Sequence, residues 1–272
     1  MNKPGSDIVF TGSISEVYES HLVPLIFEPY ATGLAGRVAA LHPSRVLETA
    51  AGTGVATRAM VRVLPANVAL IATDLNQPML DRAAVVGTVR PVQWQQADAL
   101  RLPFDDASFD VLVCQFGVMF FPDKARAFAE ARRALRPGGT LVFSVWDRIE
   151  ENEFAHVVTM ALAKVFPADP PRFMARTPHG YYDLNVVSRD LAAAGLTAAP
   201  HMETVAARSK AASAREPAIA YCQGTPLRSE IEARAGLGLA EATSACAAAI
   251  AQRFGSGPVD AKIQAHIVSV ER

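Results

Sequence analysis

The sequence has few cysteines, and none of them is arranged to bind metal or to form a disulfide framework. Three cysteines occur in 272 residues, at positions 114, 222 and 246, and no two form a C-x-x-C pair. The six histidines show no H-x-x-x-H spacing either. We therefore expect no metal, and we expect Cys114, which lies in an apolar run, to be a small core residue.

Strong net charge and long apolar runs are also absent. The formal net charge is −1, which gives no general attraction for nucleic acid or an anionic membrane. No apolar stretch approaches the ~18 residues of a membrane span, and residues 1–12 lack the apolar core of a signal peptide. The sequence thus predicts a cytoplasmic protein with neither a nucleic-acid nor a membrane partner, and it leaves a homodimer open.

Short apolar runs alternate with helical stretches from residue 45 onward. The expected strands are 45–49, 68–74, 92–97, 109–115 and 140–146, and the expected helices are 55–63, 77–86 and 123–135. This alternation indicates βαβ units around a parallel sheet with helices on both faces.

The remaining segments are expected to complete one domain. Residues 1–44 form an N-terminal helical cap, 45–147 the core, 148–185 a proline- and aromatic-rich lid or substrate insertion, and 186–272 the remaining sheet and helices. In the last part we expect a helix at 186–194, strands near 203–208 and 263–270, and an Ala-rich helical stretch at 219–254 that Gly236 and Gly238 divide.

Small residues follow the first expected strand, in the stretch VLETAAGTG at 46–54. Glycines at 52 and 54 let the backbone approach a ligand closely, and the helix that follows supplies free N–H groups. Asp74 ends the second strand, 20 residues after Gly54, where a carboxylate can bind both hydroxyls of a ribose. Asp98 ends the third strand and can accept from an adenine amine. Each aspartate could instead cap the helix that follows it.

Thr57 stands where the dinucleotide-binding pattern G-x-G-x-x-G has its third glycine. This departure argues against NAD, because the pyrophosphate of NAD needs the close approach that the full glycine pattern provides. A charged nucleoside without phosphates fits the pattern better.

The sequence resembles the class I S-adenosylmethionine-dependent methyltransferases, most closely the small-molecule group that includes ubiquinone-biosynthesis-type enzymes. Four stretches carry the resemblance: VLETAAGTG, ATDLNQPML at 72–80, ADALRLPFDDASFDVLVCQFGVMFFPD at 97–123 and ALRPGGTLVFSVWD at 134–147. The resemblance implies a Rossmann-like, doubly wound sheet of seven strands, mostly parallel with an antiparallel last strand, plus N-terminal helices and a lid insertion. It also implies S-adenosylmethionine as cofactor, with S-adenosylhomocysteine as product.

Positions that match the family motifs are the implied cofactor-binding residues. In the family, an acidic residue orients the first loop and the methionine amine, small residues form the loop, an aspartate holds the ribose with apolar residues beside the adenosine, and backbone groups after the fourth strand meet the methionine end. The matching residues are Glu48, Ala50, Ala51, Gly52, Gly54, Asp74, Leu75, Met79, Asp98, Ala99, Gln115 and Phe116, with Tyr18 closing over the carboxylate. Ala50 stands where glycine is usual and would be strained at a positive φ.

The expected function is methyl transfer to a small-molecule acceptor by in-line displacement, mainly through proximity and orientation. His179 and Tyr182, in the lid, are candidate catalytic residues; His179 could act as a general base or be an ordinary loop histidine. Two alternatives stay open: a non-catalytic S-adenosylmethionine-binding protein, and a nicotinamide-dependent oxidoreductase. The sequence identifies neither the acceptor nor the atom that receives the methyl group.

Overall fold

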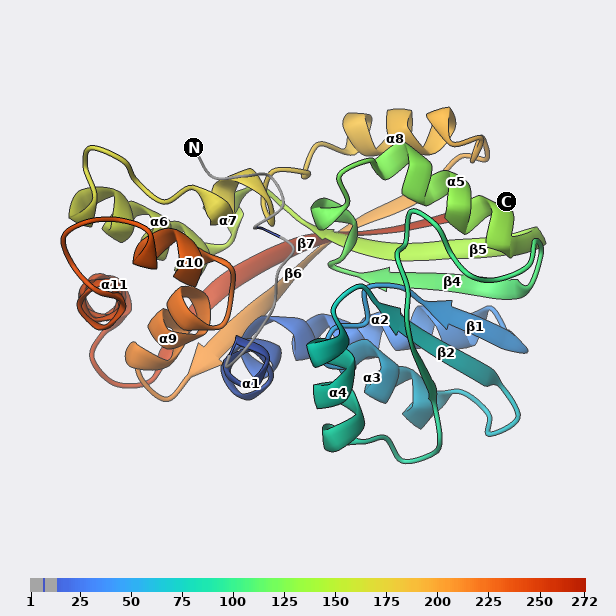
Figure 1. Cartoon of the computed structure of the whole chain (residues 1–272), viewed down its shortest axis with the longest axis horizontal. Coiled ribbons are helices and arrows are strands. Elements are labelled where there is room, and N and C mark those ends of the chain that lie inside the picture. The colour runs from blue at the N-terminus through green and yellow to red at the C-terminus, as the bar shows by residue number, and fades with distance from the viewer. Residues whose placement is uncertain (1–6, 8–13) are drawn as a thin grey trace. The chain divides into compact units, whose positions relative to one another are not determined.

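The structure is a computed structural model that describes residue 7 and residues 14–272 (Figure 1). Apart from Asp7, the segment 1–12 and its expected lack of a signal peptide lie outside the described residues. The strands are β1 (Arg45–Glu48), β2 (Ala69–Asp74), β3 (Gln93–Gln96), β4 (Phe109–Gln115), β5 (Leu135–Trp146), β6 (His201–Ala211) and β7 (Val259–Glu271).

These strands form one sheet in the order β3-β2-β1-β4-β5-β7-β6. The strands β3, β2, β1, β4 and β5 are parallel, whereas β7 runs antiparallel to β5 with Thr140 opposite Glu271. The predicted class, a seven-stranded and mostly parallel sheet with an antiparallel last strand, is confirmed. All seven expected strands are present, with ends that differ by a few residues.

The helices of the first half are α1 (Ile14–Val17), a π-helix η2 (Tyr18–Phe27), α2 (Glu28–Ala40), α3 (Val55–Val63), α4 (Gln77–Val86), a 3₁₀-helix η3 (Val118–Phe120) and α5 (Lys124–Ala134). The second half contains a 3₁₀-helix η4 (Ile149–Glu151), α6 (Glu153–Val165), α7 (Phe173–Arg176), α8 (Leu184–Ala193), α9 (Arg215–Gln223), α10 (Leu227–Glu232) and α11 (Leu239–Phe254).

Successive side chains of the central strands enter two different cores. Val111 and Val113 of β4 belong to a buried cluster with α2 and α3, which includes Met60. The alternate residues Leu112 and Cys114 lie on the other face of the sheet, where they line a space beside Phe128 of α5. Because side chains alternate along a strand, helices on both faces require the nearly continuous apolar strands seen in the sequence. Cys114 is 1% exposed, as expected of a core residue.

Two segments differ from the sequence-based expectation. The stretch 148–185 contains the helix α6, whose buried side chains Phe154, Val158 and Leu162 recur at every fourth residue. The nearby prolines obscured this helical pattern in the sequence. The Ala-rich stretch is broken between α10 and α11, where Gly236 has a φ of 114°, and also between α9 and α10, at 224–226.

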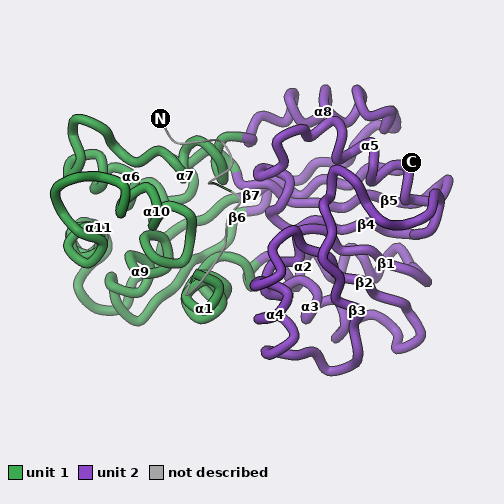
Figure 2. The backbone as a smooth tube through the Cα atoms, viewed as in Figure 1, with its two compact units in different colours: residues 1–29, 147–180, 206–264 green, residues 30–146, 181–205, 265–272 purple. Residues whose placement is uncertain are grey.

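The chain divides into two compact units (Figure 2). Unit 1 comprises the described residues of 1–29, 147–180 and 206–264, and it contains α6, α7, α9, α10 and α11. Unit 2 comprises 30–146, 181–205 and 265–272, and it contains β1 to β5, α3, α4, α5 and α8. The strands β6 and β7 contribute residues to both units. The single domain with a lid at 148–185 stays a prediction.

Within the part of the chain that the structure covers, no helix combines the length and the apolar character needed to cross a bilayer.

Candidate functional site

The loop that follows β1 contains three residues in the left-handed backbone region. Ala50, Gly52 and Gly54 have φ values of 51°, 57° and 85°. Glycine adopts this region without cost, whereas alanine there costs about 1–2 kcal/mol. The expected strain at Ala50 is therefore present, and it is stored in the loop that the sequence assigns to a ligand.

Asp74, at the end of β2, fastens this loop. Its Oδ2 accepts a hydrogen bond of 2.8 Å from the Gly52 N–H, and its Oδ1 accepts one of 2.8 Å from the Asn76 N–H. The Ala51 N–H donates to the Thr73 carbonyl at 2.9 Å. Asn76, not Asp74, is the N-cap residue of α4, so the helix-cap alternative for Asp74 is wrong. Burial raises the pKa of Asp74.

Glu48, the last residue of β1, is 1% exposed and lies beneath the same loop. Its Oε2 accepts a hydrogen bond of 2.5 Å from the Thr57 hydroxyl. Burial raises the pKa of Glu48 to about 8, although the bond from Thr57 and the charge of Arg58 lower it. The sequence alone marks Thr57 by its place in the glycine pattern and does not reveal that Glu48 is its partner.

The turn after β4 touches the loop after β1. Phe116 has a φ of 55°, and its N–H lies 3.1 Å from both the carbonyl and the hydroxyl oxygen of Ser144 on β5. A Cβ added to Gly117 would lie 2.4 Å from the Ala50 Cβ and 2.7 Å from the Cys114 Sγ. Only glycine allows these two strand tips to approach so closely.

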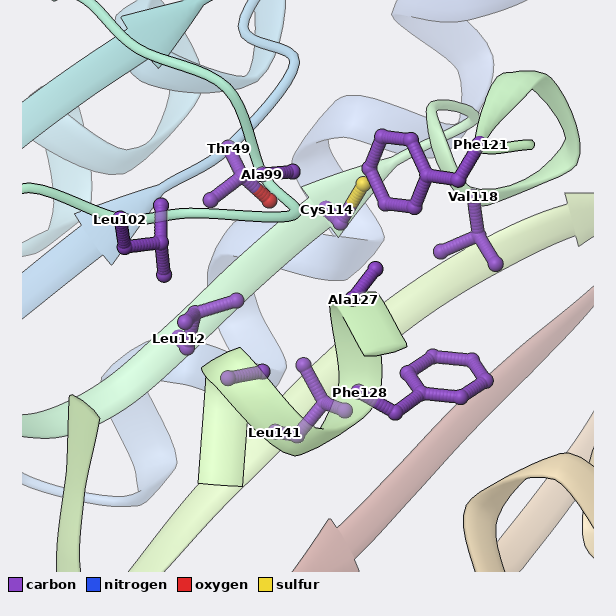
Figure 3. Close-up of a pocket in the computed structure, with 11 residues that line it drawn as sticks. Thr49, Ala99, Leu102, Leu112, Cys114, Val118, Phe121, Ala127, Phe128 and Leu141 are labelled. Atoms are coloured by element: carbon purple, nitrogen blue, oxygen red, sulfur yellow. The ribbon is translucent and has the colours of Figure 1, made fainter. Parts of the chain in front are cut away.

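The turn after β3 supplies Asp98 and Ala99. Asp98 is exposed, and its Oδ1 accepts a hydrogen bond of 2.9 Å from the Leu100 N–H, so it closes a turn and caps no helix. Ala99 lines an apolar cavity of about 10 Å³, enough for about one water molecule. Figure 3 shows this cavity, which Leu102, Val118 and Phe128 also line.

Two further side chains near the ends of β1 and β2 have features that are common in ligand sites. Leu75, directly after Asp74, is 44% exposed despite being apolar. The Thr53 Oγ1 is buried and has no hydrogen-bond partner among the described residues. Met79 is 3% exposed and Gln115 is 8% exposed. An apolar surface and an unsatisfied hydroxyl beside a strained loop fit a nucleoside that brings both a flat ring and hydrogen-bonding groups.

Unit 2 therefore gathers all the predicted cofactor-binding residues except Tyr18. That residue lies in unit 1, where its ring stacks on Phe27 with centroids 5.2 Å apart. Its part in the site stays a prediction.

The two candidate catalytic residues differ in burial: His179 is buried, whereas Tyr182 is exposed. His179, in unit 1, is 5% exposed, and its Nδ1 lies 2.8 Å from the Asp147 carbonyl oxygen. Since a carbonyl oxygen only accepts, Nδ1 carries the proton and Nε2 is the basic nitrogen. Burial lowers the pKa of His179 to about 4, although the bond to Asp147 raises it, so the ring is neutral at neutral pH. Tyr182 is 45% exposed, whereas the Tyr181 hydroxyl donates to Asp190 at 2.8 Å.

Known proteins resemble this chain in sequence. The family model described as a methyltransferase domain (Methyltransf_11) matches residues 47–143. A demethylmenaquinone methyltransferase from Deinococcus radiodurans is 34% identical over 135 residues, which cover 49% of this chain and 56% of that protein. A ubiquinone/menaquinone biosynthesis C-methyltransferase, UbiE, from Ralstonia pickettii is 32% identical over 181 residues, which cover 62% of this chain and 74% of that protein. The chain spans about half the length of several other curated relatives that it matches.

Solved structures share the fold. The YcgJ protein from Bacillus subtilis superposes with a TM-score of 0.54 at 18% sequence identity, covering 89% of this chain and 98% of that protein. At this identity the likeness shows the arrangement of strands and helices and nothing about the ligand.

Proposed function

Because this chain belongs to the class I S-adenosylmethionine-dependent methyltransferases, we propose that it binds S-adenosylmethionine at the strand tips of unit 2 and transfers the methyl group to a small molecule. The observation that carries the proposal is the loop 50–54. Three of its residues are left-handed, and Asp74 at the neighbouring strand end fastens it through Gly52. This combination brings bare backbone and a carboxylate to one edge of a parallel sheet, where open α/β sheets bind their ligands.

Each group of residues meets a different part of the donor. Asp74 binds the ribose hydroxyls, and the exposed side chain of Leu75 packs against the adenosine. Asp98 and Ala99 hold the adenine edge, beside the apolar cavity. Glu48 and the backbone of the turn at Gln115 bind the methionine end.

The geometry of Thr57 disfavours a dinucleotide. Its side chain fills the space in which the G-x-G-x-x-G pattern would leave bare backbone, and its hydroxyl is committed to Glu48. With a side chain at this position, α3 of this chain cannot pack on the strand as closely as the third glycine allows, which counts against a nicotinamide-dependent oxidoreductase.

S-adenosylmethionine supplies an electrophilic methyl group on a sulfonium, which an acceptor attacks in line. The chain's task is to hold the donor in one orientation and to exclude water, which can supply much of the acceleration. Where the acceptor atom carries a proton, His179 is the candidate base that the sequence offers, and its ring is neutral at neutral pH with the Nδ1 proton directed at the Asp147 carbonyl.

The acceptor belongs to the class of small organic molecules. Two of the relatives above are named for quinone methylation, so a demethylmenaquinone analogue is the first acceptor to try, followed by phenols, amines and thiols. A cytoplasmic location stays a prediction, and a homodimer stays open.

The test is methyl transfer by the whole chain. Methyl-labelled S-adenosylmethionine is incubated with each acceptor, and both S-adenosylhomocysteine and labelled product are quantified. Product formation from any small acceptor supports the proposal. Tight donor binding with no transfer across the panel would instead favour a non-catalytic S-adenosylmethionine-binding protein.

A further inference from the structure

Three aromatic side chains of unit 2 form a cluster at the tips of β4 and β5. Phe116 and Trp146 stack with ring centroids 3.8 Å apart and planes 6° apart. Tyr30, from α2, meets both rings edge-on, with centroids 5.4 Å from Phe116 and 5.5 Å from Trp146. No member of this aromatic cluster is more than 4% exposed, so each ring is fixed by its neighbours.

The cluster accounts for an unfavourable backbone conformation. Phe116 has a φ of 55°, a region that a bulky residue leaves unless its surroundings hold it there. The N–H of Phe116 is held by Ser144, and its ring is held by Trp146. Tyr30 is itself anchored, because its hydroxyl donates to the Val205 carbonyl on β6 at 3.1 Å.

The position of Phe116 determines where the next residue lies. Gly117 approaches Ala50 so closely that an added Cβ would lie 2.4 Å from the Ala50 Cβ. A shift of the Phe116 ring would therefore move Gly117 against the loop that carries Ala50, or away from it. The loop 50–54, which we call the donor loop, is therefore connected to the aromatic cluster by direct packing through Gly117.

We propose that Trp146 and Tyr30 are positioning residues that hold the turn at Phe116–Gly117 against the loop 50–54 and thereby set the affinity for the methyl donor. This inference rests on the proposed function, since it concerns the same donor site. Neither residue belongs to the family motif positions that the sequence assigns to the cofactor. Both act through Phe116.

The experiment measures S-adenosylhomocysteine affinity by calorimetric titration of the full chain. Trp146→Leu removes the stacked ring, and Trp146→Phe restores an aromatic plane. The matched control is Phe143→Leu on the same strand, because Phe143 is fully buried, its ring centroid lies 5.2 Å from that of Phe128 of α5, and it is not a member of the aromatic cluster. Thermal unfolding is recorded for every variant, so that affinity is compared between proteins that are folded.

We expect Trp146→Leu to weaken binding about tenfold, Trp146→Phe to stay within about threefold of the unaltered chain, and Phe143→Leu to bind normally despite a comparable loss of stability. Phe116→Leu removes the other half of the stack and gives a second test if Trp146→Leu does not fold. Because both changes break one contact, the double variant should lose about as much affinity as either single variant.

Two results overturn the inference by itself: normal affinity in Trp146→Leu or Phe116→Leu, or an equal loss of affinity in Phe143→Leu. Failure of the unaltered chain to bind S-adenosylhomocysteine is a different result, which would remove the proposed function and this inference together. Tyr30→Leu provides a milder change of the same kind, and it should lower affinity less than Trp146→Leu does, because it leaves the stack in place.

Discussion

The hydroxyl of Thr57 donates a hydrogen bond to the buried carboxyl group of Glu48, and so joins the start of α3 to the end of β1 beneath the donor loop. Thr57→Val keeps the shape of the side chain and leaves the buried carboxyl without this donor, which we expect to cost about 1–3 kcal/mol of stability. Urea unfolding measures the change.

Thr57→Ser is the control, because it keeps the hydroxyl and should preserve most of the stability. If Thr57→Val were as stable as the unaltered chain, the bond between these two residues would not support the loop.

The raised pKa of Glu48 leads us to expect that the stability of the protein depends on pH. Burial raises its pKa from 4.5 to about 8, so between these values the folded chain keeps a proton that the unfolded chain has released. The stability that this group contributes is therefore fully present below about pH 4.5 and is lost as the pH rises through about 8. Glu48→Gln, which cannot titrate, should become more stable relative to the unaltered chain as the pH rises, by up to about 1.4 kcal/mol per pH unit.

Unfolding free energies of both proteins, measured between about pH 5 and about pH 8, give this difference directly. Asp74 shifts in the same direction, so the unaltered curve alone is not diagnostic. A difference between the two proteins that does not vary with pH would show that Glu48 titrates normally.

Replacing the strained Ala50 by glycine should stabilise the protein. Its φ of 51° is strained for alanine and free of strain for glycine, so Ala50→Gly should raise the free energy of unfolding by about 1 kcal/mol. Ala51→Gly, at the next position, where φ is not positive, should lower it by roughly 0.5–1 kcal/mol through the extra freedom of the unfolded chain. Thermal unfolding of the two variants side by side checks the opposite signs; equal destabilisation by both would contradict the strain.

A substitution of His179 should lower the rate of catalysis without changing the affinity for the donor. If its Nε2 is the base, His179→Gln should reduce kcat by roughly 10²–10⁴-fold and leave the affinity for S-adenosylhomocysteine unchanged. With a pKa of about 4, the unaltered enzyme should keep this base neutral, and kcat should fall only as the pH approaches about 4. Steady-state kinetics with a protonated acceptor test this expectation, and full activity in His179→Gln would leave His179 with a purely structural bond to Asp147.

The sequence predicts the parts of this molecule that depend on local pattern. Apolar runs mark the strands because helices cover both faces, and Gly52 and Gly54 mark a loop that needs positive φ. The condition attached to Ala50, strain at a positive φ, could be stated without a structure because only backbone sterics are involved.

Contacts between distant segments could not be predicted in the same way. The pairing of Thr57 with Glu48 depends on how α3 leaves the loop, and the stack of Phe116 on Trp146 depends on the register of β4 and β5. The helix α6 was hidden by the prolines that follow it, although its apolar residues have helical spacing. The sequence places Asp74 at the end of a strand, as the structure does, but the bond of Asp74 to the Gly52 N–H requires the folded loop.

Calorimetric titration of the purified chain with S-adenosylhomocysteine and, separately, with NADH tests the central claim most directly. The account predicts saturable binding of S-adenosylhomocysteine, no binding of NADH, a loss of about 1–3 kcal/mol of binding free energy in Asp74→Ala, and no loss in Asp81→Ala, which removes an exposed carboxylate of α4. Binding of NADH at the same site, or unchanged S-adenosylhomocysteine affinity in Asp74→Ala, would contradict it.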